Sequence, residues 1–479
     1  MGAMSSSSTI MWFRDDLRIN DNMALRWAAN RGPVIGLLID DTTERPGVRR
    51  LGGAARWWWQ RSIQELAASL KEYGVPLLLH EGNPLEILPE VAQTFGAGAV
   101  TWTRRYHKPL RDVDAEIKTH LRKKDLEVHS HPGFLLTEPW EVSSGSGAPY
   151  KVYTPFSKTA FPIADAYDME LSDDFPDVLG GPETGGFTEI QVSDDPHWIG
   201  EMPQHCSPGE KSAQQRLSSF AEELQEKGGY AEGRDEMARN VTSRLSAHLR
   251  FGEISVHRVW TEINTLADTG DIDPEDAHSF LKELLWRDFA WHRLYALENM
   301  QNTNVREIFN RFGWAWEATE ISRLTDGRHP LKPTGDDEFH QSFAAWRAGR
   351  TGIPLVDAGM RELWATGSMH NRSRMVVASF LTKNLQIHWR HGEEWFWETL
   401  VDADPASNSF NWQWAAGSGD DASPYFRIFN PETQAIKFDP DSEYIRRWVP
   451  EYGTPVYPEP IVDLKESRRE ALDAYEAIK

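Results

Sequence analysis

The stretch ARWWWQRSIQELAASLKEYG, residues 55–74, decides the fold class of the first third of the chain. Its apolar residues recur at helical spacing and it ends in a glycine, which is a usual helix stop. The runs VIGLLID (34–40) and PLLLH (76–80) flank it and are typical of buried strands. Two more such runs, TIMWF (9–13) and AVTWT (99–103), complete an alternation of strands and helices. This alternation predicts a parallel sheet with helices on both faces.

The sheet region lacks the common signature of a dinucleotide site. No G-x-G-x-x-G follows the first predicted strand, so the standard fingerprint is missing there. The aromatic run Trp57, Trp58 and Trp59 lies within the predicted helix, and we interpret it as helix packing rather than as a shelf for a chromophore.

The composition changes twice along the chain. From about residue 136 to 205 it is rich in Gly, Pro, Ser and Asp, which indicates a long connection across the surface. After residue 210 the segments at 212–229, 277–299 and 371–389 all show the 3.6-residue periodicity of helices. We therefore predict three parts: an α/β, Rossmann-like domain (5–135), an interdomain linker (136–205) and an all-α domain (206–479).

Charge and cysteine content bound the setting. The chain has 51 Lys and Arg against 73 Asp and Glu, a net charge of −22, which by itself argues against a nucleic-acid partner. Arginines near aromatic residues in the last third nevertheless leave a local basic face possible. No run is long and apolar enough for a membrane span, and a single cysteine suits a reducing cytosol. We expect a cytoplasmic monomer with no membrane association.

Four segments carry candidate chemistry. In VTSRLSAHLRFGEIS (241–255), the hydroxyls of Thr242, Ser243 and Ser246 either cap an ordinary helix or serve a phosphate at a helix start. In KELLWRDFAWH (282–292), Glu283 and Arg287 lie four apart on one helix face. They form either an exposed ion pair of little value or a partly buried carboxylate that needs a specific purpose.

The other two segments lie further along the chain. MHNRSRM (369–375) mixes polar, cationic and soft apolar groups within two turns, and a solvent-facing surface is equally compatible with it. In VDADPASNSFNWQWAAG (401–417), Asp402 and Asp404 precede Asn408 and two tryptophans. These carboxylates could hold a cation, a ring N–H, a ribose hydroxyl or Arg374, or could belong to a surface loop. No His or Cys cluster supports a metal site, and we predict none.

Together these segments resemble one family, the photolyase/cryptochrome flavoproteins. The resemblance runs nearly end to end, through MWFRDDLRINDNMAL, TSRLS, ELLWRDF, GRTGIPLVDAGMREL, MHNRSRM, DADPASN, WQWAAGSGDDASPYFRIFNP and FDPDSEYIRRWVPE. An ordered series of such long matches is very specific.

The resemblance implies that the helical domain binds a U-shaped FAD. The residues at the family's cofactor positions are Tyr230, Thr242, Ser243, Arg244, Leu245, Ser246, Glu283, Arg287, Asn371, Arg374, Asp402, Asp404 and Asn408. Of these, Asn408 falls at the position that faces flavin N5. An antenna chromophore is implied in the N-terminal domain, with 5,10-methenyltetrahydrofolate favoured over a deazaflavin.

The implied activity is light-driven repair of cyclobutane pyrimidine dimers in DNA, by electron transfer from reduced FAD to a flipped-out lesion. The residues at catalytic positions are Glu283, Asn408, Trp286, Trp414, Met375 and Asn371. Trp286 and Trp414 match walls that stack on the lesion, and Arg372 and Arg427 match contacts to the DNA backbone.

Electron relay positions match Trp412 and then Trp389. The family's distal tryptophan falls on or near Asp336, so that Trp397 or another aromatic residue would have to replace it.

Two features separate the subfamilies. Photolyases for (6-4) lesions carry a histidine pair near the flavin, where this chain matches with Asn371 and Met375, and this favours the cyclobutane dimer. Plant-type cryptochromes resemble the chain in RRLGGAARWWW but usually carry Asp where this chain has Asn408. A neutral Asn that can donate a hydrogen bond favours the reduced, repair-competent flavin. The alternative function is a blue-light-sensing cryptochrome without repair activity.

Overall fold

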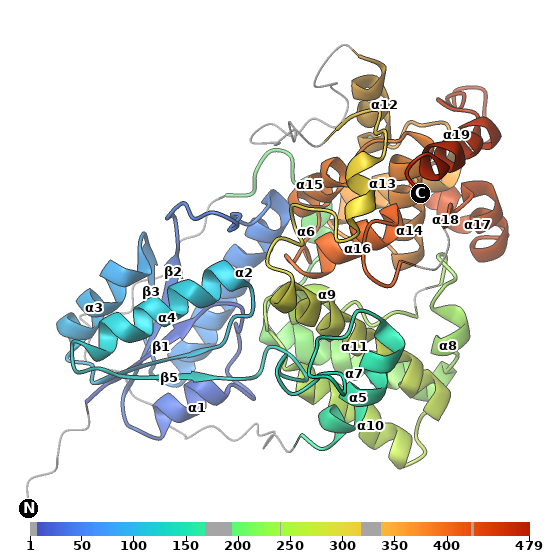
Figure 1. Ribbon diagram of the computed structural model, residues 1–479. Helices are drawn as coiled ribbons and strands as arrows, with labels where there is room; N and C mark the ends of the chain where they lie inside the picture. Colours follow the sequence, from blue (N-terminus) through green and yellow to red (C-terminus); the bar gives the residue numbers. More distant parts are fainter. Residues whose placement is uncertain (1–6, 168–193, 240, 318–336, 423–425) are drawn as a thin grey trace, which may run out of the picture.

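The computed structural model describes residues 7–167, 194–239, 241–317, 337–422 and 426–479, in an α/β part and a helical part that lie side by side (Figure 1). The α/β part holds a five-stranded parallel sheet in the order β3-β2-β1-β4-β5. The strands are β1 Thr9–Phe13, β2 Val34–Asp40, β3 Leu77–Glu81, β4 Ala99–Thr103 and β5 Glu127–His131. The predicted α/β fold class and its four strands are confirmed.

The edge strand β5 is the one that the sequence did not reveal. Its sequence is EVHSH, and only Val128 is fully buried, so it lacks the apolar run that marks the other strands. An edge strand needs only one partner, and here β4 supplies it in parallel register.

Helices cover both faces of the sheet in the way its alternating side chains require. Met11 and Phe13 face one side, where they pack with α1 (Met23–Ala29) and α2 (Gly53–Glu72). Ile10 and Trp12 face the other side and pack with α3 (Pro84–Phe95) and α4 (Lys108–Arg122). This is the doubly covered arrangement of a Rossmann-like sheet.

The three consecutive tryptophans lie within α2 and are buried, which confirms that they serve packing. The Nε1 of Trp57 donates to Asp195, and that of Trp58 donates to Glu253. The rings of Trp57 and Trp58 therefore place their large apolar surfaces in the core while their N–H groups donate to acceptors.

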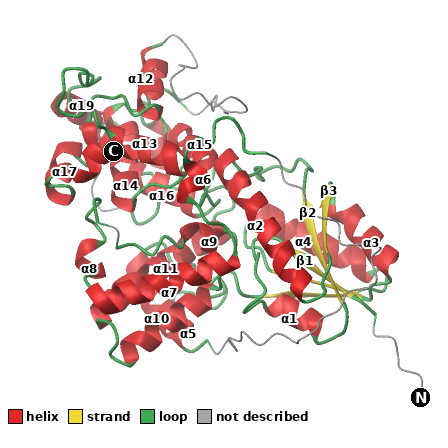
Figure 2. Ribbon diagram, turned by 180° about the vertical axis from the view of Figure 1, so that it is seen from behind, coloured by secondary structure: helices red, strands yellow, loops and turns green. Residues whose placement is uncertain are grey.

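The rest of the chain is helical within the described residues (Figure 2). Its helices are α5 Tyr153–Asp165, α6 Met202–His205, α7 Glu210–Lys227, α8 Tyr230–Gly233, α9 Ser246–Arg250, α10 Val256–Asp268, α11 Pro274–Ala296, η1 Glu307–Arg311, α12 Glu338–Arg347, α13 Pro354–Thr366, α14 Asn371–Ser379, η2 Phe380–Asn384, α15 Trp389–Thr399, α16 Ser407–Ala416, α17 Pro431–Phe438, α18 Glu443–Trp448 and α19 Leu464–Glu476. Helix α5 stands inside the predicted linker, where Pro155 and Pro162 obscured its pattern.

The helix predicted over residues 371–389 is wrong in its length. Helix α14 ends at Ser379 and continues as a π-helical turn over Phe380–Asn384. Gln386 then adopts a positive φ of 52°, which no α-helix accommodates. His388 caps the start of α15, because its Nδ1 accepts from the Arg390 N–H at 3.2 Å. The apolar periodicity thus runs across a break that only the backbone conformation reveals.

The two parts meet along the segment that follows β1. The Leu17 N–H donates to the Phe251 carbonyl at 3.0 Å, and Arg250 pairs with Asp15 at 2.7 Å. Gly252 has a φ of 61°, and a Cβ there would lie 2.2 Å from the Asp15 carbonyl oxygen, so the close approach requires glycine.

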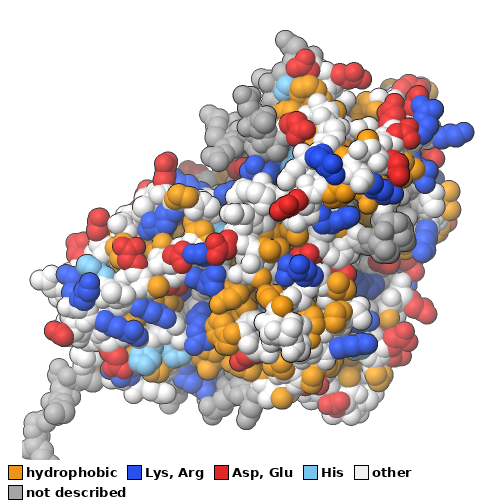
Figure 3. All heavy atoms as spheres, in the orientation of Figure 1, with side chains coloured by type: hydrophobic (Ala, Val, Ile, Leu, Met, Phe, Trp, Pro, Cys, Tyr) orange, Lys and Arg blue, Asp and Glu red, His pale blue; other side chains and the backbone are white. Residues whose placement is uncertain are grey.

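The surface carries mixed charge. On the face in Figure 3, acidic and basic side chains are interspersed, and a hydrophobic area lies over the connection between β5 and α5. Trp140 and Val152 in that connection are 55% and 45% exposed. None of the helices in the described ranges combines the length and apolar character that a membrane span requires.

Glu210 gives the contact between the two parts a pH dependence. At the start of α7, its carboxylate accepts from the Ile19 and Asn20 N–H groups at 2.7 and 2.8 Å. Burial raises the pKa of Glu210 from 4.5 to about 7, although these two backbone N–H groups lower it. Because of the raised pKa, the folded state keeps the Glu210 proton up to a higher pH than the unfolded state does. The contribution of Glu210 to stability is therefore present at low pH and is lost as pH rises to about 7.

We predict that Glu210→Gln becomes progressively more stable relative to the native chain as pH rises from about 5 to 7, because the variant has no carboxyl to ionise. Urea unfolding at several pH values measures the difference in unfolding free energy. Glu226→Gln, at an exposed position of the same helix, is the control and should give a difference that does not change with pH. A flat profile for Glu210→Gln would contradict the burial of a titrating carboxyl.

Candidate functional site

A cavity of about 1070 Å³ opens in the helical part. Its walls come from α2, α6 to α9, α11, α13 to α16 and α18 and from the segments between them. Sixteen residues singled out from the sequence line it: Tyr230, Thr242, Ser243, Arg244, Leu245, Ser246, Glu283, Arg287, Asn371, Arg374, Met375, Asp402, Asp404, Asn408, Trp412 and Trp414. Positions almost 200 residues apart therefore converge on one site.

Four other candidates are not among the residues that line the cavity. Trp286 stacks face to face on Tyr153, with ring centroids 3.6 Å apart. Trp389 is fully buried, and its Nε1 donates to Asn304 at 2.8 Å. Arg372 pairs with Asp235 and lies 4.2 Å from the Phe438 ring, while Arg427 lies 5.9 Å from the Trp414 ring.

The segment before α9 supplies hydroxyls to the cavity. The interpretation of Thr242 and Ser243 as caps of an ordinary helix is wrong, since α9 begins at Ser246 and no side chain caps it. Arg244 adopts a positive φ of 52°, and Ser243 Oγ accepts only a long bond of 3.4 Å from the Leu245 N–H. This strained turn orients the segment along the cavity wall instead of closing the helix.

Helix α11 presents Glu283 and Arg287 to the cavity with separate partners. The i,i+4 pair considered from the sequence is not the interaction that either residue makes. Glu283 accepts from Arg234 at 2.7 Å. Arg287 donates to the carbonyls of Phe134 and Leu249 at 2.8 and 3.3 Å, and burial lowers its pKa.

Arg374 and Asp402 form a bidentate pair on the cavity wall, with N–O distances of 3.2 and 2.9 Å. The sequence offered this pairing as one alternative, and the structure confirms it. Asp404 instead accepts from the Ala406 and Ser407 N–H groups at 2.8 and 2.7 Å and so fixes the start of α16. Neither carboxylate lies in a simple surface loop.

Helix α14 carries Asn371 and Met375 to the cavity. His370 precedes the helix, and its Nδ1 accepts from the Arg372 N–H at 3.2 Å. Burial lowers the pKa of His370 to about 4, so this imidazole is neutral near pH 7 and can act as the capping acceptor.

Helix α16 places Asn408 and Trp412 one turn apart on the cavity wall, and Trp414 lies there as well. The Nδ2 of Asn408 donates to the backbone carbonyl of Glu393 at 3.0 Å and to its carboxylate at 2.7 Å. Trp414 donates to the Asp421 carbonyl at 3.1 Å, whereas the buried Nε1 of Trp412 has no partner among the described residues.

The Asn408 bonds correct one prediction. The sequence predicts that Asn408 donates a hydrogen bond toward the flavin. Both amide hydrogens are already taken by Glu393, so the group that remains available is Oδ1, which is an acceptor.

Sequence reasoning missed several residues of this cavity. Arg234 holds Glu283, and Tyr444 donates to Glu362 at 2.6 Å within the cavity wall. His248 also lines the cavity, and behind the wall it pairs with the buried Glu253, which accepts from Ser62. No local pattern in the sequence could have suggested the first pair. Arg234 lies at the end of α8 and Glu283 lies on α11, and only the fold brings these two helices together.

The residues present fit an FAD. The volume is at the upper end of the roughly 300–1,000 Å³ that small-molecule sites occupy, which suits a dinucleotide. Hydroxyls of Thr242, Ser243 and Ser246 and nearby arginines suit a diphosphate, and Trp412 offers an indole face with an unpartnered N–H. The acceptor Oδ1 of Asn408 suits a ring N–H.

Comparisons with known proteins agree with this assignment. The family model for the FAD binding domain of DNA photolyase matches residues 280–455, and the DNA photolyase model matches residues 9–175. The chain is 40% identical over 508 residues to a deoxyribodipyrimidine photo-lyase of Agrobacterium fabrum, covering 100% of this chain and 99% of that one. It is 35% identical to cryptochrome-1 of Arabidopsis thaliana, over 94% of this chain and 64% of that protein.

A solved structure gives the same result. The chain matches the crystal structure of a bacterial class III photolyase from Agrobacterium tumefaciens with a TM-score of 0.87 and 39% identity, over 100% of this chain and 98% of that one. The chain therefore belongs to the photolyase/cryptochrome family, and its helical part is an FAD-binding domain.

We predict that Asp402→Ala lowers the affinity for FAD by at least about tenfold, because it leaves Arg374 without its bidentate partner and removes a carboxylate from the cavity wall. Fluorescence titration with FAD measures this. The control is Glu451→Gln, which disrupts the bidentate pair with Arg361 away from the cavity lining. Equal losses in the two variants would show that general stability, not the site, governs binding.

Proposed function

We propose that this protein repairs cyclobutane pyrimidine dimers in DNA with light, by electron transfer from reduced FAD to a flipped-out lesion. One observation carries the proposal. Glu283, Asn371, Met375 and Trp414, the residues that match lesion contacts, line the same cavity as the residues that match cofactor contacts. A lesion in this cavity and a flavin beneath it would share one desolvated space.

The bound FAD would supply the electron for repair. Arg374 and Asp402 would hold the edge of its ring system, and the hydroxyls of the Thr242–Ser246 segment would hold its phosphates. Asn408 would accept from the ring N–H through Oδ1. These contacts orient the cofactor and exclude water around it.

Residues of the outer cavity wall would recognise the lesion. Flipping a damaged base pair costs a few kcal/mol, less than for an intact pair, since pairing is already weakened. Trp414 is partly buried and offers an aromatic surface, while the Glu283 carboxylate offers acceptors to the N–H groups of thymine. Arg234 at 2.7 Å keeps that carboxylate oriented.

The remaining predicted residues have supporting roles in the proposal. Trp286 would serve as a lesion wall whose one face rests on Tyr153. Arg372 and Arg427 would contact the DNA backbone, with Arg372 held in place by Asp235.

For the electron relay, Trp412 would be first. The ring centroids of Trp346 and Trp412 lie 6.1 Å apart. The second electron-transfer step would therefore use Trp346 or the predicted Trp389. The position near Asp336 lies outside the described residues.

We predict that reduced, FAD-loaded protein restores thymine absorbance in an oligothymidine carrying one cyclobutane dimer under blue light, and not in the dark. Glu283→Ala should lower the repair quantum yield by about tenfold or more, since a hydrogen bond to a charged group is worth ~1.5–3 kcal/mol. Glu275→Ala, at an exposed position of the same helix, is the matched control and should repair normally.

Two outcomes would count against the proposal. An unchanged quantum yield in Glu283→Ala would remove Glu283 from the mechanism. No repair by a fully loaded, reduced sample that also binds damaged and intact DNA equally would favour the blue-light-sensing alternative, which the similarity to cryptochrome-1 supports.

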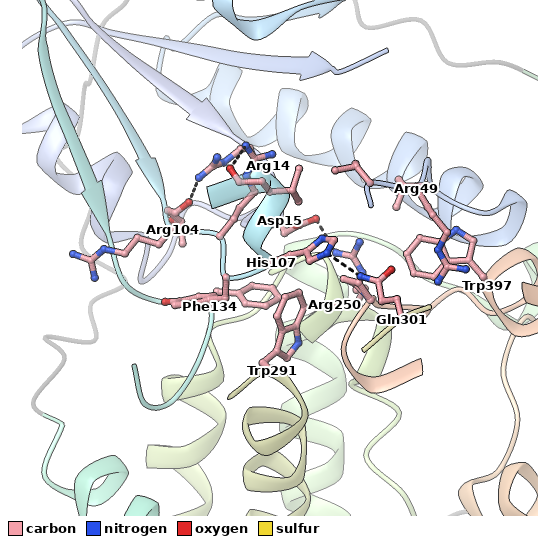
Figure 4. A pocket seen from close by; sticks show the side chains of 17 residues that line it. Arg14, Asp15, Arg49, Arg104, His107, Phe134, Arg250, Trp291, Gln301 and Trp397 are labelled. Atoms are coloured by element: carbon pink, nitrogen blue, oxygen red, sulfur yellow. Dashed lines mark hydrogen bonds and ion pairs between the residues drawn. The ribbon is translucent and has the colours of Figure 1, made fainter. Parts of the chain in front are cut away.

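The N-terminal domain would hold the antenna chromophore. A pocket lies at the carboxyl ends of β1 and β4, where the strand order reverses and ligands of such sheets usually bind (Figure 4). Arginines and aromatic residues line it, among them Arg14, Arg105, Tyr106 and Phe134. Its volume of about 80 Å³ is well below that of typical ligand sites, so a chromophore here requires its side chains to move.

We predict that protein purified from cells grown with folate and deazaflavin releases 5,10-methenyltetrahydrofolate on extraction, identified by mass spectrometry. The similarity to plant cryptochromes in the segment RRLGGAARWWW favours the folate. Release of a deazaflavin, at one molecule per protein, would contradict this prediction.

A further inference from the structure

The segment between β2 and α2 contains Arg49, whose guanidinium reaches into the helical part. It donates to both carboxylate oxygens of Glu393, at 2.9 and 2.5 Å, and to Glu394 at 3.0 Å. Glu393 lies on α15, and its side chain is only 2% exposed. A cation and hydrogen bonds at such a site offset the free-energy cost of burying the carboxylate.

The same carboxylate holds Asn408. Its Oε1 accepts one amide hydrogen of Asn408 at 2.7 Å, and the Glu393 backbone carbonyl accepts the other at 3.0 Å. The backbone carbonyl is always an acceptor, and a carboxylate offers only acceptor oxygens. Turning the amide over would set the Asn408 Oδ1 against two acceptors, so the charge on Glu393 dictates that Oδ1 is the group left for the cavity.

The segment around Arg49 makes several contacts with α15. The guanidinium lies 4.1 Å from the Trp397 ring, and the Trp397 indole donates to the Arg50 carbonyl at 2.8 Å. A Cβ at Gly52 would lie 1.8 Å from the Trp397 carbonyl oxygen, so this contact requires glycine. Figure 4 shows Arg49 beside Trp397 at the edge of the N-terminal pocket.

We propose that Arg49 is a positioning residue through which the N-terminal domain sets the redox chemistry of the flavin: it holds both carboxylate oxygens of Glu393, and Glu393 in turn fixes Asn408 with Oδ1 toward the cavity. The inference rests on the proposed function, since it takes Asn408 to face flavin N5. Reduced flavin carries a hydrogen at N5, and an acceptor opposite it stabilises the reduced form. The RRLGGA sequence (49–54) thereby has a role beyond packing.

The test is the midpoint potential of bound FAD, measured by spectroelectrochemistry without DNA. Arg49→Met should shift the potential to a more negative value, because Glu393 loses the partner that fixes both of its oxygens and no longer holds the Asn408 amide in one orientation. Arg49→Lys should restore part of the shift. Arg258→Met, which disrupts the contact of α10 with Asp21 between the same two parts, is the control and should leave the potential unchanged.

A double-mutant cycle separates positioning from a general charge effect. Asn408→Ala alone should also shift the potential to a more negative value, and adding Arg49→Met to it should cause no further shift. An equal shift on adding Arg49→Met in both backgrounds would show that the arginine acts by its charge alone and would overturn the inference. If Asn408→Ala leaves the potential unchanged, the placement of Asn408 at N5 fails instead.

Loss of FAD from Arg49→Met does not end the test. Glu393→Gln keeps the volume of the side chain but allows its amide to turn a donor toward Asn408, and it should give the same negative shift. A potential equal to that of the native chain in Glu393→Gln would overturn the proposal. None of these outcomes depends on repair, so a negative repair assay leaves the inference testable.

Discussion

A cavity of about 1070 Å³ with many charged residues in its wall is the constraint that organises the helical part. Such a space cannot be stabilised by apolar packing, and each charge at its edge costs free energy unless a partner compensates it. The helices meet this cost locally. Arg374 pairs with Asp402, Arg234 pairs with Glu283, and Arg287 donates to two carbonyls. The walls are therefore largely preorganised for a cofactor.

The aromatic residues complete this arrangement. Trp412 is buried in the cavity wall, and the buried Trp346 meets it edge to face. Large rings with few polar atoms keep the space dry on one side, while charged pairs define it on the other. The many tryptophans of the chain thus serve both the core and the candidate site.

The α/β part contributes more than a second domain. Its sheet places the segments after β1 and β2 against the helical part, where Asp15 contacts Arg250 and Arg49 contacts Glu393. Because Glu393 also binds Asn408, a change at the boundary between the two parts can reach the cavity through two hydrogen-bonded steps. This connection is physical, since one carboxylate bonds both Arg49 and Asn408.

The sequence by itself determined that the first third forms a parallel sheet with four of its strands, that the second half is helical and, through its resemblance to a family, sixteen residues of the cavity wall. Those inferences rest on periodicity and on local motifs, which the linear chain carries. Pairing partners were decided only by the tertiary structure. Glu283 pairs with Arg234 and not with Arg287, its neighbour four residues along the chain. The Asn408 amide is oriented by Glu393. Both contacts join side chains that only folding brings together. The break after Ser379 was likewise invisible, since the residue pattern does not show whether the backbone bonds to the fourth or to the fifth residue back.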